Sequence, residues 1–114
     1  MNEIEERIIR KLVGLLIAAG YKLSVWDGEG YAITGSGSVD DTLAAMGHTG
    51  QDTLQVSRPW QQDAYGADVG DIYLVYGNDG HDVIADDIVE PMLNHILDEV
   101  EAFADALAQE NDHA

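Results

Sequence analysis

The stretch from Asp71 to Asp87 constrains the fold most, because two β-prone runs stand on either side of a short polar segment. The first run is Ile72–Tyr76, the second is His81–Ala85, and Gly77–Gly80 joins them. Asn, Asp and Gly tolerate the positive φ angles that tight hairpin turns need, so the pattern predicts an antiparallel hairpin. The chain before it supplies another hairpin and helices, and the chain after it supplies a long acidic helix that needs a sheet to pack on.

Further strands are expected upstream of this hairpin. Residues Tyr21–Trp26 alternate between the two faces of a half-buried strand, and Asp27–Gly30 turns the chain into Tyr31–Thr34. The alternation returns in Thr53–Arg58, which a proline follows. The segment 60–70 has neither the helical nor the strand period and is expected to be a loop.

Two helices are expected in the first half of the chain. Asn2 can cap a helix at Glu3–Ala19, because Glu5 follows it at the spacing of a capping box. The second half of this helix, Leu12–Ala19, is apolar nearly all round, which predicts burial both under the sheet and against a second helix or a second subunit. A short helix is expected at Ser38–Met46.

The chain ends in a long acidic helix. Asp86 or Asp87 is expected to cap it, because Glu90 follows Asp87 at the spacing of a capping box. Pro91 would then stand in the first turn, where its missing N–H costs least. Residues 110–114 are expected to fray. A core stripe recurs every three or four positions and comprises Leu93, Ile96, Leu97, Val100, Phe103, Ala104 and Leu107.

The order of these elements predicts a single α+β domain, 1–114. We expect a two-layer sandwich, in which an antiparallel sheet of four to five strands, arranged as a meander, packs the N-terminal and C-terminal helices on one face. The absence of cysteine excludes disulfides and thiolate chemistry and is compatible with a cytoplasmic protein. The longest apolar run is far shorter than the roughly 20 residues of a membrane span.

The net charge of −17 is unevenly distributed along the chain. The first 20 residues are neutral overall, whereas residues 81–114 hold ten acids and no base. Such a field repels nucleic acid and anionic lipid and favours encounter with basic protein surfaces. A purely solubilising role of the acids is the competing interpretation.

Two sets of side chains are candidates for contacts with a partner. Acids gather on one side of the last helix. Aromatic rings, which commonly anchor protein interfaces, lie in or near the expected strands. The acidic candidates are Glu90, Asp98, Glu101 and Asp105, and the aromatic candidates are Trp26, Trp60, Tyr73 and Tyr76.

Catalytic and metal motifs are weakly represented. No serine stands in a nucleophile-elbow context, and no cofactor motif is present. His81, Asp82, Asp86 and Asp87 form a carboxylate and imidazole cluster that would suit a divalent cation, although their spacing matches no metal signature. Turn and capping chemistry explains these residues more simply.

Two segments, 23–29 and 74–86, resemble small uncharacterised bacterial and prophage-type proteins in their turn-rich strands. The resemblance implies a small accessory protein and assigns no chemistry to any residue. We therefore expect a non-enzymatic interaction protein that forms a homodimer and binds a basic protein partner, and that binds neither nucleic acid nor membrane. A sharper form is a nucleic-acid mimic that inhibits a nucleic-acid-binding protein. The alternative is a small metal- or ligand-binding protein that uses the cluster around His81.

Overall fold

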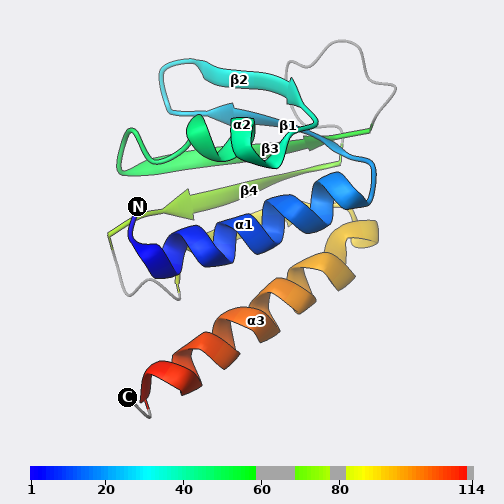
Figure 1. The fold of residues 1–114 in the computed structure, drawn as a ribbon. Helices are drawn as coiled ribbons and strands as arrows, with labels where there is room; N and C mark the ends of the chain where they lie inside the picture. Colours follow the sequence, from blue (N-terminus) through cyan, green and yellow to red (C-terminus); the bar gives the residue numbers. More distant parts are fainter. Residues whose placement is uncertain (59–68, 78–81, 113–114) are drawn as a thin grey trace.

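A five-stranded antiparallel sheet, covered on one face by helices, makes up the protein (Figure 1). The computed structural model describes residues 1–58, 69–77 and 82–112. In chain order the elements are α1 (Glu3–Ala18), β1 (Lys22–Trp26), β2 (Tyr31–Ser36), α2 (Val39–Ala44), β3 (Gln51–Ser57), β4 (Gly70–Val75), β5 (Ile84–Val89), the 3-10 helix η1 (Pro91–Leu93) and α3 (Asn94–Asp112). The predicted α+β class is confirmed.

The strand order β2-β1-β3-β4-β5 corrects the expected meander. Strand β1 pairs with both β2 and β3, so the chain must pass from β2 across β1 before it enters β3. Helix α2 makes this passage on the helical face of the sheet and contacts both β1 and β2. As a result β1 is an interior strand, and its apolar side chains Leu23 and Val25 are fully buried.

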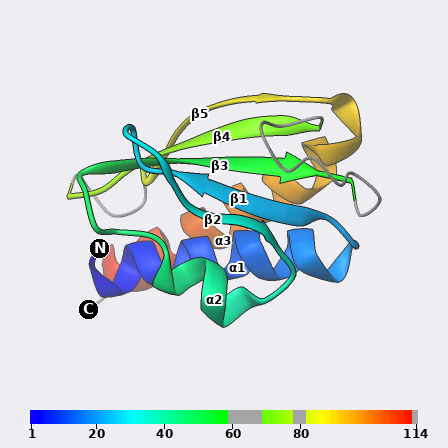
Figure 2. The same cartoon turned by 90° about the horizontal axis from the view of Figure 1, so that it is seen from above.

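Helices α1 and α3 lie on the same side of the sheet and contact each other (Figure 2). Helix α1 is packed between the sheet, α2 and α3, which explains why its apolar residues extend nearly all round. Leu12, Val13 and Leu16 are completely buried within the single chain, so no second subunit is needed to cover them. Homodimerisation stays a prediction.

The capping box at the start of α1 is confirmed and extends to the sheet. The side chain of Asn2 accepts the Glu5 N–H, and the Glu5 carboxylate accepts the Asn2 N–H, both at 2.8 Å. The second oxygen of the buried Glu5 carboxylate accepts the Gly77 N–H, also at 2.8 Å. One side chain therefore joins the N-terminus of α1 to the end of β4.

The expected start of the last helix is wrong. Asp86 and Asp87 do not cap a helix but lie in β5, where they pair with Tyr73 and Ile72 of β4. Backbone hydrogen bonds to β4 stabilise the extended conformation of this segment, and a helix starting at Asp86 or Asp87 would lose them. Pro91 favours an extended conformation in the residue before it and begins η1, so α3 starts only at Asn94. The turn 78–81 of the predicted hairpin lies outside the described residues.

Helix α3 continues to Asp112, and the last part of the predicted frayed tail, 113–114, lies outside the described residues. Within the described ranges, no helix is long and apolar enough to cross a membrane.

Gly14, in the interior of α1, offers a simple test of the helix. A Cβ added there would meet no atom within 4 Å, and the backbone is helical, so alanine should fit without strain. We expect Gly14→Ala to raise the free energy of unfolding by about 0.5–1 kcal/mol, because alanine loses less conformational entropy in a helix. Urea denaturation measures the gain. A loss of stability would show that α1 needs a smaller residue at this position.

Candidate functional site: an acidic groove between β5 and α3

The last strand and the last helix enclose a groove of about 330 Å³, called here the β5–α3 groove. Its lining comes from three elements and from the segment just before β5. The lining residues are Ile8, Asp82, Ile84, Ala85, Asp86, Asp87, Leu97, Val100, Glu101, Ala104 and Asp105.

The floor of the groove is apolar. Ile8 from α1, together with Val100 and Ala104 from α3, is buried beneath it. Ile84 of β5 and Leu97 of α3 are only half-buried and leave part of their side chains accessible. A ligand in the groove would therefore contact hydrocarbon as well as charge.

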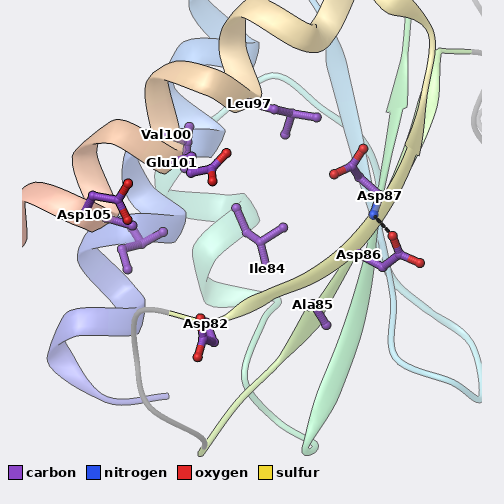
Figure 3. A pocket seen from close by; sticks show the side chains of 11 residues that line it. Asp82, Ile84, Ala85, Asp86, Asp87, Leu97, Val100, Glu101 and Asp105 are labelled. Atoms are coloured by element: carbon purple, nitrogen blue, oxygen red, sulfur yellow. Dashed lines mark hydrogen bonds between the residues drawn. The ribbon is translucent and has the colours of Figure 1, made fainter. Parts of the chain in front are cut away.

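The rim of the groove is acidic on both sides (Figure 3). Glu101 and Asp105 stand one helical turn apart on α3, and Asp87 extends from β5 toward the helix. Asp86 lies on the other side of β5, and its carboxylate accepts the Asp87 N–H at 2.8 Å. All these side chains are exposed, and no Lys or Arg occurs from residue 81 to the end of the chain.

The structure brings together residues that the sequence placed in two separate groups. Asp82, Asp86 and Asp87 were metal candidates, whereas Glu101 and Asp105 were candidates for partner contacts, and all five line the same groove. The groove was not recognisable from sequence. One feature of the sequence could have indicated the half-buried floor residue Leu97. Leu97 precedes Glu101 by four residues, so the two side chains lie on the same side of the helix.

Other acidic candidates lie elsewhere. Asp98 is exposed on α3 but does not line the groove. Glu90 precedes η1, and its backbone N–H donates to the Val69 carbonyl at 2.8 Å. These two residues are therefore separate from the acidic pair formed by Glu101 and Asp105.

A metal centre gains no support from the described residues. Within residues 1–58, 69–77 and 82–112, no three His, Asp or Glu side chains are grouped so that they could hold a metal ion. His81, the imidazole of the proposed cluster, lies outside these ranges.

Two of the aromatic candidates lie on the sheet face opposite the helices. Trp26 and Tyr73 are both register partners of Thr53, so the three side chains form a row across β1, β3 and β4. Trp26 also makes an edge-to-face contact with Tyr31, with ring centroids 5.0 Å apart. Trp60 lies outside the described residues.

Tyr76 is instead on the helical side of the sheet. Its hydroxyl donates to the buried Asp52 carboxylate at 2.6 Å, and the same carboxylate oxygen accepts the Gly47 N–H at 3.0 Å. Burial and the Asp52 carboxylate raise the pKa of the Tyr76 hydroxyl well above its ordinary value. Tyr76 therefore ties the end of β4 to the beginning of β3. Its ring is half-buried, and its hydroxyl is engaged by Asp52.

Asp71, on the outer face of β4, carries an unfavourable charge. One carboxylate oxygen is buried and has no hydrogen-bond partner among the described residues, and burial raises the pKa of Asp71 above its ordinary value. Because this pKa is higher in the folded chain than in the unfolded chain, the ionised carboxylate opposes folding. That cost disappears as the pH falls through the folded-state pKa.

Asp71→Asn should therefore be more stable than the natural chain at about pH 7, and the difference should shrink as the pH approaches about 4. Urea denaturation at several pH values measures this difference. Asp98→Asn, at an exposed position of α3, controls for the general relief of charge repulsion. A gain in stability of Asp71→Asn that does not change with pH would contradict the raised pKa of Asp71 in the folded chain.

No family model matches the chain, and no significant match was found among curated proteins or solved structures.

Proposed function

We propose that this protein is a non-enzymatic binding protein that engages a basic protein partner through the β5–α3 groove. The observation that carries the proposal is a half-accessible apolar floor bounded on both sides by carboxylates. Lys and Arg have the matching chemistry, because their hydrocarbon stems cover apolar surface while their charged ends reach acids. An uncharged ligand would form no ion pair with the carboxylates of the rim, and a small cation would make no contact with the apolar floor.

The distribution of basic residues supports the same function. The bases Arg7, Arg10 and Lys11 are grouped on α1. Arg10 already forms ion pairs with Glu6 and Asp40, at 3.6 and 3.2 Å, so it is partly neutralised away from the groove. The Lys11 ammonium lies 5.7 Å from the centre of the Phe103 ring on α3 and offsets part of the negative charge of that helix. The remaining negative charge around β5 and α3 should attract basic surfaces and accelerate their association at low salt.

The more specific form of the proposal is a cytoplasmic nucleic-acid mimic. The side chains of Glu101 and Asp105 leave α3 about 5–6 Å apart, as expected for residues one turn apart. This spacing is on the scale of neighbouring phosphates, so the pair could occupy the phosphate-binding groove of a nucleic-acid-binding protein. A small accessory protein of prophage type, as the resemblance implies, would suit this role.

Neutralising the groove tests the proposal. The whole chain serves as bait in a lysate of its native host, and Glu101→Gln/Asp105→Asn is compared with Asp98→Asn/Glu99→Gln. Both double variants remove one Asp and one Glu charge from exposed positions of α3, but only the first alters the groove. We expect the groove variant to weaken capture of basic proteins by about three- to tenfold and to flatten its salt dependence, since exposed charge pairs contribute up to about 1 kcal/mol each.

The control variant should retain capture. Equal behaviour of the two variants would mean that the acids serve solubility, and the proposal would then fail. Captured proteins that are neither basic nor sensitive to salt would also contradict it.

A further inference from the structure

Strand β5 forms an edge of the sheet. The strand order ends there, and no other strand in the part of the chain that the structure describes pairs with its second edge. The Glu90 N–H, just beyond β5, donates to the Val69 carbonyl on the β4 side. Because backbone direction alternates along a strand, Ile88 and Asp86 also bond toward β4, whereas Asp87 and Val89 direct their N–H groups outward.

One of these outward groups has a replaceable partner. The Asp87 N–H donates to the carboxylate of its own neighbour, Asp86, at 2.8 Å in an exposed position. A local bond of this kind contributes only about 1 kcal/mol, because water competes for both groups. A cationic side chain can take over the Asp86 carboxylate, and the Asp87 N–H is then available to another acceptor.

We propose that β5 binds an extended, Lys- or Arg-bearing segment of the partner, which adds to the sheet as a sixth strand. This inference rests on the proposed function and specifies the conformation of the bound partner. Side chains of an added strand point alternately to the two sheet faces. One set would lie over the β5–α3 groove, facing Asp87, Glu101 and Asp105, and the other set would lie beside Asp86 and Ile88. The Ile88 side chain is 67 % exposed and offers that second set an apolar contact.

Charge favours a basic segment over a second copy of this chain. Antiparallel pairing of two β5 strands keeps the helical faces of both sheets on the same side, so directly opposite residues must belong to the same face. Pairing about the centre of β5 would therefore place Asp86 of one copy against Asp86 of the other, or Asp87 against Asp87. Like charges directly opposite each other destabilise a strand pair. Acids on an edge strand therefore discourage self-association while attracting a strand of opposite charge.

The probe is a short capped peptide of alternating lysine and valine. Its control is the same peptide with every backbone nitrogen methylated, which keeps the charge but leaves neither edge of the peptide an N–H donor for strand pairing. We expect the unmodified peptide to slow hydrogen exchange of the Asp87 and Val89 amides and to bind about tenfold more tightly than the methylated form. Equal affinity of the two peptides, or binding without protection of these amides, overturns the inference.

Variants of Asp87 supply the reciprocal test on the protein. Asp87→Asn removes the charge alone, whereas Asp87→Pro removes the charge and the outward N–H. Proline is tolerated on an edge strand where the N–H faces solvent. We expect Asp87→Pro to bind the unmodified peptide about tenfold more weakly than Asp87→Asn does. Should Asp87→Pro unfold, as circular dichroism would show, the methylated peptide decides the question.

Three outcomes separate this inference from the proposed function. If the groove variant loses capture but the peptide never protects β5, strand addition is wrong and the proposed function stands. If β5 is protected with unchanged affinity in Glu101→Gln/Asp105→Asn, the groove function fails and strand addition stands. Protection that grows with the concentration of the protein alone identifies a second copy as the occupant and overturns the inference.

Discussion

Gly70→Ala should lower the free energy of unfolding by about 2–4 kcal/mol, because β4 and β5 leave no room for a side chain at this position. A Cβ on residue 70 would lie 2.5 Å from Cγ1 of Val89 and 2.8 Å from its Cα. The Val89 side chain can rotate, but its Cα cannot move without shifting β5. The strands must therefore separate or lose register.

Thermal and urea denaturation would measure this loss, with a fall in melting temperature of about 10 °C. Gly37→Ala is the matched control, since an added Cβ there meets nothing within 4 Å and the glycine has no positive φ. Because β5 forms one wall of the groove, Gly70→Ala should also weaken partner capture. A stability equal to that of Gly37→Ala would contradict the close pairing of residues 70 and 89.

Glu5→Ala should cost about 2–4 kcal/mol, the second large effect. The Glu5 side chain is buried and accepts two backbone N–H groups, from Asn2 and from Gly77, each at 2.8 Å. Alanine leaves both donors without this acceptor and opens a cavity beside them. Gly77 has a φ of 86°, a conformation that strains residues other than glycine.

Asn2→Ala separates the two roles of the Glu5 carboxylate. This variant removes only the bond that Asn2 Oδ1 accepts from the Glu5 N–H, and should cost about 1 kcal/mol. Glu5→Gln keeps one carbonyl acceptor, so its loss in free energy of unfolding should lie between those of Asn2→Ala and Glu5→Ala. If urea denaturation gives Glu5→Ala and Asn2→Ala the same stability, the bond to Gly77 contributes nothing and the proposed link between α1 and β4 is wrong.

Local patterns in the sequence were sufficient for the elements whose stability is decided locally. The capping box of Asn2 and Glu5 predicted the start of α1, because donor and acceptor lie within one turn of the chain. The first hairpin, Tyr21–Thr34, was likewise predicted from alternation on both sides of a glycine-rich turn, and β1 and β2 do pair.

The same reasoning failed where a local pattern competed with a distant partner. Asp87 and Glu90 have the spacing of a capping box, yet β4 pairs with this segment and keeps it extended. A capping box can be recognised from four neighbouring residues. The strength of the competing pairing with β4, which lies on the other side of a turn, cannot be judged from residue spacing. The position of β1 between β2 and β3 was missed for the same reason, since strand order depends on packing across the whole sheet.

Most of the residue types of the candidate site could be predicted from the sequence, which shows a base-free acidic segment with an apolar stripe along its helix. Only the tertiary structure placed Asp87 of β5 opposite Glu101 and Asp105 of α3, with Ile84 and Leu97 between them. The physical reason is the range of the interactions involved. Helical spacing relates residues within a turn or two, but the distance between β5 and α3 is set by the pairing of β5 with β4 and by the packing of α3 on α1.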